Sequence, residues 1–129
     1  MTDVPSRPFS NFYLEPSRNG LTRPKRVRGV GCKMVNMGEI FAHGRLRDVQ
    51  MDRVPLEERD LSSVLQAGDL LFARQSLVLS GAGKCSIFLG DVEPVCFESH
   101  IIRVRLNQVK GDPLFFYYLF QSPRGRSAI

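Results

Sequence analysis

The segment SGAGKCS, from Ser80 to Ser86, contains the residue types that bind nucleotide phosphates, namely glycine followed by lysine and a small polar residue. A P-loop requires the spacing GxxxxGK[ST], in which backbone amides surround the phosphate and the Ser or Thr hydroxyl holds magnesium. Here Val78 occupies the first glycine position and Cys85 replaces the Ser or Thr. The pattern fails at two positions, so the sequence predicts neither a nucleotide site nor a bound cofactor.

Three cysteines and two histidines could in principle supply a thiol nucleophile and its base, or the ligands of a metal. The cysteines are far apart and lack CxxC spacing, so we expect them to be small core residues of a protein from a reducing compartment. His100 precedes an apolar run, where a hydrogen-bonded structural histidine is the more common role. No Asp or Glu stands two residues before a lysine, as the ExK element of a metal-dependent nuclease would require. We therefore predict no catalytic and no metal-binding residues, and a cysteine nucleophile ranks a distant third among the possible functions.

Apart from these patterns, side chains that donate hydrogen bonds are concentrated in two stretches without Asp or Glu. These are residues 18–33 and the loop between apolar runs at 70–73 and 85–89. Guanidinium, amide and hydroxyl groups in acid-free loops match phosphate groups and base edges. Acidic residues gather elsewhere, so we expect one positive face and one mixed face. A solvated loop without a partner and an acidic protein partner remain open at this point. The donors of the two stretches are Arg18, Arg23, Lys25, Arg26, Arg28, Lys33, Arg74, Gln75, Ser76, Ser80, Lys84 and Ser86.

Apolar runs at 70–73, 85–89 and 101–106 predict three buried strands that position the central loop. We further expect strands at 32–37 and 45–54, a turn at Asn19 with Gly20, and a short helix or turn over 37–41. Asp60 is expected to cap a short helix that ends at Gly68, and Pro113 to begin an amphipathic helix. These elements predict an α+β fold: a single compact domain with a mostly antiparallel or mixed β-sheet, a few short helices and a C-terminal helix.

The chain has 129 residues, of which 43% are hydrophobic and 24% charged, with a formal net charge of +5. These values fit one globular domain. We expect residues 1–14 to form an extended N-terminal arm, anchored by Phe9, Phe12 and Tyr13, and residues 15–129 to form the folded domain. No apolar run is long enough to span a membrane and no signal-peptide pattern is present, so we expect a cytoplasmic protein without a membrane partner.

Five segments, in the same order, resemble the target recognition domain of the specificity (S) subunit of type I restriction-modification systems. The most specific part is GD[IL]LFxR with GxGK, followed by FxSx[IL]IR[IV]R and a helix that closes on SPxG. The resemblance covers about residues 15–129. The segments are NGLTRPKRVRGVGCKMVNMGEIF, QAGDLLFARQS, GAGKCSIF, FESHIIRVR and LFFYYLFQSPRGR.

The resemblance implies a domain of mixed α/β character whose loops read one half of a split DNA sequence and perform no chemistry. It implies double-stranded DNA, methyltransferase (M) subunits and restriction (R) subunits as partners. A typical S subunit has two such domains and a coiled coil, so a second recognition domain or self-association is also expected. The alternative is a protein-interaction module that docks on a methyltransferase subunit without reading DNA. The matching loops nominate as DNA-binding residues Arg18, Asn19, Lys25, Arg26, Arg28, Arg74, Gln75, Ser76, Ser80 and Lys84.

Overall fold

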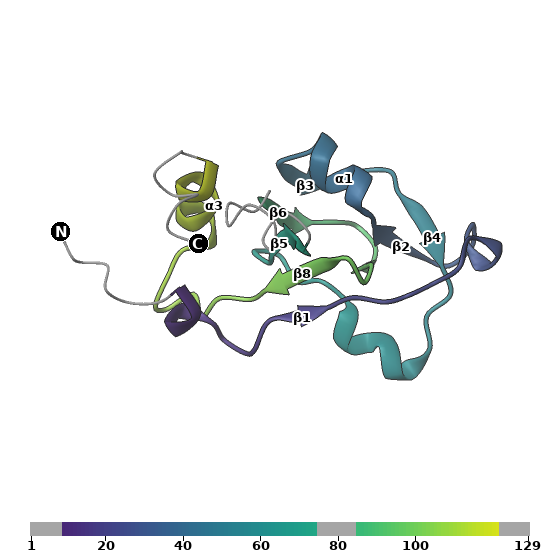
Figure 1. Cartoon of the computed structure of the whole chain (residues 1–129), viewed down its shortest axis with the longest axis horizontal. Coiled ribbons are helices and arrows are strands. Elements are labelled where there is room, and N and C mark those ends of the chain that lie inside the picture. The colour runs from purple at the N-terminus through teal and green to yellow at the C-terminus, as the bar shows by residue number, and fades with distance from the viewer. Residues whose placement is uncertain (1–8, 75–84, 122–129) are drawn as a thin grey trace.

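We describe a computed structural model of the chain over residues 9–74 and 85–121, apart from the side chain of Lys25. Two β-sheets form its centre, and helices α1 and α3 cover opposite faces of the larger one (Figure 1). This arrangement is the α+β fold with a C-terminal helix that the sequence predicts. The helices are α1 (Met37–Ala42), α3 (Pro113–Gln121) and the 3-10 helices η2 (Phe9–Phe12), η3 (Lys25–Val27) and η4 (Glu58–Ser63).

The larger sheet has the strand order β1-β8-β5-β6-β3, and all its neighbours are antiparallel except β3 and β6. The smaller sheet has the order β4-β2-β7, in which β2 is parallel to β7 and antiparallel to β4. Both sheets are therefore mixed or antiparallel, as expected. The strands are β1 (Arg18–Asn19), β2 (Cys32–Val35), β3 (Arg45–Arg47), β4 (Asp52–Val54), β5 (Leu70–Ala73), β6 (Cys85–Gly90), β7 (Val95–Phe97) and β8 (Ile101–Val104).

Strand β5 lies at the centre of the larger sheet, and its four residues are all buried. Successive side chains of a strand point to opposite faces, so a strand covered on both sides has a continuous apolar run. Leu70 and Phe72 pack under α3, whereas Leu71 and Ala73 pack with Ile40 of α1. The run at 70–73 is apolar throughout because both faces of this strand are covered.

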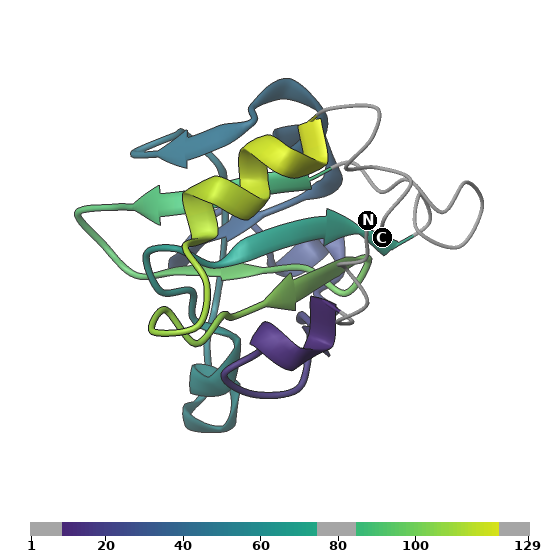
Figure 2. The ribbon, with the colours of Figure 1, turned by 90° about the vertical axis from the view of Figure 1, so that its left-hand side faces the viewer.

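Helix α3 crosses one face of the larger sheet, and η2 lies beside it (Figure 2). The ring of Phe9 lies edge-on to the rings of Tyr13 and Phe120, with centroids 5.3 and 5.0 Å apart. Phe12 contacts Phe116 at 5.0 Å. The three aromatic residues predicted to anchor the N-terminal arm thus pack against the core beneath α3, and Phe9–Phe12 form a 3-10 helix; the rest of the predicted arm, residues 1–8, lies outside the described residues.

Several local predictions are wrong, and each has a physical reason. Asn19 does not begin a turn, because β1 pairs with β8. The stretch 45–54 forms two strands in different sheets, β3 and β4. Asp60 is not the N-cap of η4: Glu57 is, and the Asp60 carboxylate accepts the Glu57 backbone N–H at 2.9 Å in a capping box. Short strands that depend on distant partners leave little periodic signal in the sequence.

Ser86, which the sequence places among the loop donors, is fully buried in β6. Its hydroxyl donates to the carbonyl oxygens of His43 (2.7 Å) and Ile40 (3.2 Å), so it holds the end of α1 against the sheet. Among the residues that the structure describes, no helix is both long and apolar enough to cross a lipid bilayer.

Candidate nucleic-acid interface

The predicted contact residues Asn19 and Arg74 both bond to the turn that joins β7 to β8. This turn lies at the end of the larger sheet where β1 and β5 finish, and we call this end of the strands the rigid edge. The Asn19 side-chain amide donates to the carbonyl oxygen of Ser99 (3.0 Å), and the Arg74 backbone amide donates to that of His100 (2.9 Å). Both side chains are exposed. Arg74 and Cys85 flank the central loop, so the structure places the ends of that loop and the end of β1 at the same edge.

Arg18 lies one residue before Asn19 in β1, and its guanidinium donates to the carbonyl oxygen of Ser62 in η4 (3.2 Å). This bond brings η4 alongside the first basic segment. Arg18 is exposed. A guanidinium has five N–H donors, so one bond to a carbonyl leaves most of its capacity for a ligand.

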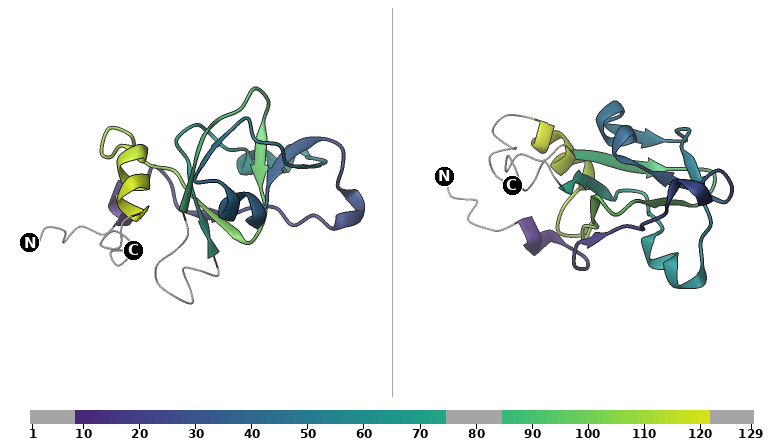
Figure 3. Two further views of the ribbon diagram at one scale, coloured as in Figure 1. Left: turned by 90° about the horizontal axis from the view of Figure 1, so that it is seen from above. Right: turned by 45° about the vertical axis from the view of Figure 1, so that its right-hand side comes forward.

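Beyond Leu21 the chain runs to η3, which stands at the end of the molecule formed by the smaller sheet (Figures 1 and 3). Arg26 on η3 is exposed and has no hydrogen-bond or ion-pair partner within the described part of the chain. The views separate η3 from the end of β5 (Figure 3). The nominated cations thus form two groups, one at the sheet edge and one at η3.

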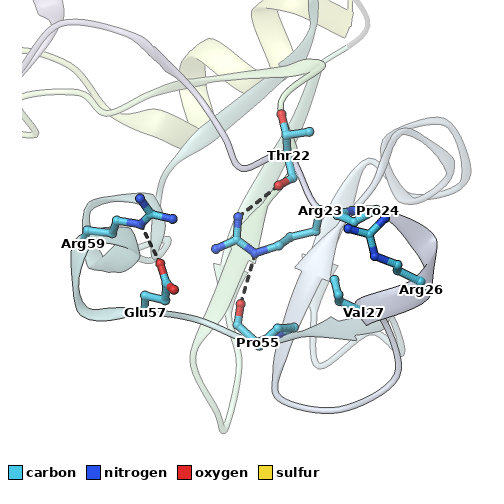
Figure 4. A pocket seen from close by; sticks show the side chains of 8 residues that line it. All are labelled: Thr22, Arg23, Pro24, Arg26, Val27, Pro55, Glu57 and Arg59. Atoms are coloured by element: carbon cyan, nitrogen blue, oxygen red, sulfur yellow. Dashed lines mark hydrogen bonds and ion pairs between the residues drawn. The ribbon is translucent and has the colours of Figure 1, made fainter.

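A shallow pocket of about 320 Å³ lies between η3 and the segment that leads into η4 (Figure 4). Arg26 lines it together with Arg23 and Arg59, while Glu57 supplies its carboxylate. The Arg59 guanidinium pairs with Glu57 at 2.6 Å, and both side chains are largely exposed. Arg59 was missed by sequence reasoning, because it lies in an acid-rich segment far from the first basic stretch. Arg23 is paired with Asp60 and Arg59 with Glu57, so Arg26 is the lining arginine that has no ion-pair partner within the described residues.

Arg28, one of the nominated residues, is committed to internal bonds. Its guanidinium donates to the carbonyl oxygen of Arg23 (3.1 and 3.3 Å), to the Asn36 side chain (3.3 Å) and to Asp52 (3.4 Å). These bonds hold the turn that contains η3 against β2 and β4. The arrangement gives Arg28 a positioning part in this turn.

Gly31 ends the same turn and adopts a φ of +114°. A Cβ at this position would lie 2.3 Å from the carbonyl oxygen of Val54. The glycine is therefore required both by its backbone angle and by the close approach of β4. Close contact with the protein's own backbone thus accounts for the glycine at position 31.

Acidic residues from distant segments neutralise much of the first basic stretch, so the expected division into a positive and a mixed face is wrong. Arg23 forms an ion pair with Asp60, and Lys33 pairs with Asp91 at 2.6 Å. The side chains of Lys33 and Asp91 are 9% and 0% exposed. Asp91 does not lie solvated in a surface turn: it anchors β2 to the segment before β7.

The two acids of this segment both have lowered pKa values. Burial by itself would raise the pKa of Asp91, but the Lys33 ammonium and the amides of Glu93 and Val92 outweigh it and leave the pKa lowered. Glu93 receives two hydrogen bonds from Arg53 (2.5 and 2.9 Å), and these lower its pKa. Both carboxylates are thus held in the charged form as structural partners of cations.

Arg103 and Arg105 of the third predicted strand are structural. Arg103 is 1% exposed and pairs with Glu15 at 2.8 Å. Arg105 binds Asp69 through two bonds of 2.8 Å, which raise the pKa of the guanidinium. Arg103 thus ties the segment before β1 to strand β8. Arg105, which directly follows β8, ties the segment before β5 to it.

The chemistry of the cysteines argues against a thiol nucleophile. Cys96 is buried in the smaller sheet, and burial raises the pKa of its thiol to about 12. Burial also raises the pKa of Cys32, whose side chain packs against the same cluster. A thiolate is the reactive species, so these two thiols are poor nucleophiles. Within residues 9–74 and 85–121, no three His, Cys, Asp or Glu side chains cluster in a way that could hold a metal ion.

The remaining nominated side chains, namely those of Lys25, Gln75, Ser76, Ser80 and Lys84, lie outside what the structure describes. The site therefore rests on Arg18, Asn19 and Arg74 at the sheet edge and on Arg26 at the pocket. Its geometry offers exposed nitrogen donors at the end of the larger sheet and, separate from them, a pocket lined by arginines at η3. Such an arrangement can bind a polyanion and hydrogen-bond to base edges.

No protein-family model matches this chain, and no curated protein sequence matches it. Solved structures are similar to it, among them the following two. One is a chain from a study of complex assembly and conformational transition of the type I R-M system, at 16% identity and a TM-score of 0.55, covering 85% of this chain and 26% of that chain. The other is the HsdS subunit from Thermoanaerobacter tengcongensis, also at 16% identity and a TM-score of 0.55, covering 88% of this chain and 27% of that chain.

The present chain spans about a quarter of the length of either structure. The identity is low, so the likeness concerns the path of the backbone. It agrees with the resemblance drawn from the sequence motifs, which named the specificity subunit of type I restriction-modification systems. The chain has the fold of a segment of an HsdS subunit.

Proposed function

We propose that the chain binds double-stranded DNA in a sequence-specific manner, as the target recognition domain of a type I specificity subunit. The observation that carries this proposal is the likeness of 88% of the chain to part of an HsdS subunit. The side chain of Asn19 and the backbone of Arg74 both bond to the turn between β7 and β8, where the central loop is attached, and this placement supports it. In this function the chain directs partner subunits to one half of a split target and has no catalytic activity of its own.

Two kinds of contact follow from the geometry. The exposed guanidinium groups of Arg26 and Arg59 at the pocket suit phosphate oxygens, which fix the position of the protein on the duplex. Asn19 and Arg74 lie on the rigid edge of the sheet, where side chains can address base edges in the major groove. The proposed contact residues are Arg18, Asn19, Lys25, Arg26, Arg59, Arg74, Gln75, Ser76, Ser80 and Lys84, with Arg28 holding the turn behind them.

The proposed partners are a methyltransferase subunit, a restriction subunit and either a second recognition domain or a second copy of the chain, acting in the cytoplasm. A surface for a protein partner is available on α3, where Phe115 and Tyr118 are 60% and 54% exposed. The Tyr118 hydroxyl lies 3.4 Å from Arg45 on the edge strand β3, so cationic and aromatic groups adjoin there. Aromatic residues and arginine are enriched in protein interfaces.

A selection from a random pool of duplexes tests the proposal. The protein is incubated with the pool at two salt concentrations, and bound duplexes are amplified and sequenced over successive rounds. We expect one short sequence to be enriched, with affinity that falls steeply as salt rises. Enrichment of no sequence at either salt concentration would overturn sequence-specific recognition.

The docking alternative predicts a different result. A chain that only docks on a methyltransferase subunit would co-purify with that subunit, and the variants R74A and K84A would leave its activity unchanged. DNA recognition predicts that both variants lose affinity for the selected duplex. The two functions are therefore separated by one pair of substitutions.

A further inference from the structure

We propose that His100 determines specificity by accepting a hydrogen bond from the exocyclic amino group of an adenine or a cytosine in the major groove. This inference rests on the proposed DNA recognition and deepens it. His100 lies in the turn between β7 and β8, beside Asn19 and Arg74. The sequence favours a hydrogen-bonded structural role for it; the ring does lie within hydrogen-bond distance of Glu98, but the His100 side chain is 74% exposed.

Glu98 holds the imidazole of His100 in a defined orientation. One carboxylate oxygen of Glu98 accepts the His100 backbone N–H at 2.6 Å, and the other lies 3.1 Å from ring nitrogen Nδ1. The Glu98 side chain is only 12% exposed, so the carboxylate is supported by the protein while the ring projects from it. An exposed histidine that is fixed by a nearly buried carboxylate is pre-organised for contact with a ligand.

The chemistry of this pair sets the tautomer. A carboxylate can only accept hydrogen bonds, so Nδ1 of His100 must carry the proton. In the neutral ring the second nitrogen, Nε2, is then a hydrogen-bond acceptor. Within the described residues Nε2 has no partner. With the ring neutral, the turn therefore presents one oriented acceptor to the surface.

An acceptor at this position complements the guanidinium of Arg74, which only donates, and adds to the amide oxygens of Asn19 and Gln75, which can also accept. Arginine, lysine and the nitrogen of an asparagine amide only donate, so they read the acceptors of guanine, adenine N7 and thymine. Adenine N6 and cytosine N4 are donors, and reading either requires an acceptor from the protein. His100 stands between Asn19 and Arg74 because Ser99 binds the first and the His100 carbonyl binds the second.

His43 is the matched control, because the chain has only two histidines. It is also exposed, at the end of α1, and its backbone amide donates to Glu39 at 2.9 Å. His43 immediately precedes Gly44 and β3, which is the edge strand farthest from β1 in the order of the larger sheet. A hydrogen bond from a base to the His100 ring should therefore leave the His43 ring unaffected, although the His43 carbonyl oxygen accepts the Ser86 hydroxyl near the end of the central loop.

The first test is a long-range ¹H–¹⁵N spectrum of the two imidazole rings in the free protein and after addition of the selected duplex. We expect neutral His100 to carry its proton on Nδ1, and its Nε2 signal to shift on binding while the His43 signals stay in place. A proton on Nε2 in the free protein, or His100 signals that the selected duplex leaves unchanged, would overturn the inference.

The second test couples the residue to a base. Each adenine and cytosine of the selected duplex is replaced in turn by an analogue without the exocyclic amino group, and binding is measured for wild type, H100A and H43A. One replacement should weaken wild-type and H43A binding by about five- to tenfold and have no further effect in H100A. Equal sensitivity of H100A and wild type at every position contradicts the inference while leaving DNA recognition intact. If the selection enriches no sequence, both proposals fail.

Discussion

The backbone amide of Arg74 donates a hydrogen bond to the carbonyl oxygen of His100 at 2.9 Å, which joins the end of β5 to the turn between β7 and β8. Ser99 precedes His100 in this turn, and its carbonyl oxygen accepts a hydrogen bond from the side-chain amide of Asn19 at 3.0 Å. Three segments that are far apart in the sequence thus converge at one rigid edge. We regard this edge as the frame that presents the central loop and its neighbours to a duplex.

Replacing Arg74 by alanine should weaken binding to the selected duplex without unfolding the protein, because the side chain is exposed. Loss of one phosphate contact would reduce the magnitude of the salt slope, d log K/d log[salt], by about 0.9, whereas loss of a base contact would relax specificity and leave the slope unchanged. Fluorescence anisotropy over a salt series measures both quantities. R47A is the matched control, since Arg47 is an exposed cation on the distant edge strand β3. An equal loss in R47A would point to net charge instead of the edge.

Arg26 and Arg28 should respond differently to alanine substitution although they lie two residues apart. R28A removes bonds to Arg23, Asn36 and Asp52, and we expect a loss of about 1 to 2 kcal/mol in the free energy of unfolding. R26A removes an exposed side chain from the pocket and should lower DNA affinity with little change in stability. Urea unfolding and anisotropy on both variants give the comparison. A stability loss in R26A equal to that in R28A would contradict the division between contact and positioning.

Gly31→Ala should be more damaging than Gly29→Ala. Both glycines have positive φ values, +114° and +124°, so each alanine is strained by about 1 to 3 kcal/mol. At position 31 the added Cβ would also meet the Val54 carbonyl oxygen at 2.3 Å, whereas at position 29 nothing lies within 4 Å. Thermal unfolding of both variants measures the difference. Equal melting temperatures would show that β4 does not press against the turn.

The Lys33 and Asp91 pair should make the protein sensitive to acid. The pKa of Asp91 is lowered below its ordinary 3.8 in the folded state, so its contribution to stability is present above that value and is lost as the pH falls through the folded pKa. D91N should lose about 3 kcal/mol near neutral pH, because a buried ammonium is left without its partner. The stability of D91N should also fall less steeply with acid, the remaining slope coming from Glu15 and Glu93.

Urea unfolding of wild type and D91N at pH values from about 2 to 7 tests this prediction. If the free energy of unfolding of D91N lay below that of wild type by the same amount at every pH, the charge of Asp91 would not contribute to stability. The variant K33M is the companion measurement, because it removes the ammonium and leaves the Asp91 carboxylate without its partner.

The fold was predictable where burial leaves a pattern. Strand β5 reads as four apolar residues because both its faces are covered, and α3 follows Pro113 with apolar residues at helical spacing. Strand β1 was missed because its two residues, Arg18 and Asn19, are exposed and polar and pair only with β8. Nothing local to these residues signals a strand.

The site was harder to predict, since its charges are balanced over long distances. The acid-free stretch from 18 to 33 looks uniformly basic in sequence, yet Asp91 reaches Lys33 from 58 residues away and Asp60 reaches Arg23 from 37. Pairing of this kind is a property of the folded chain alone. Ser86 shows the same limit: a serine beside a glycine-rich loop reads as a loop donor, although its hydroxyl serves α1 inside the core.

The most direct measurement is the ratio of dissociation constants for the selected duplex and a scrambled duplex of the same composition, at one fixed salt concentration near physiological. We predict that wild type prefers the selected duplex by at least about a hundredfold. R74A should reduce this ratio or the absolute affinity, while R47A should change neither. A single recognition domain is expected to show a smaller preference than two linked recognition domains that read both halves of a target. A ratio of one for wild type, with both duplexes bound equally, would contradict the account.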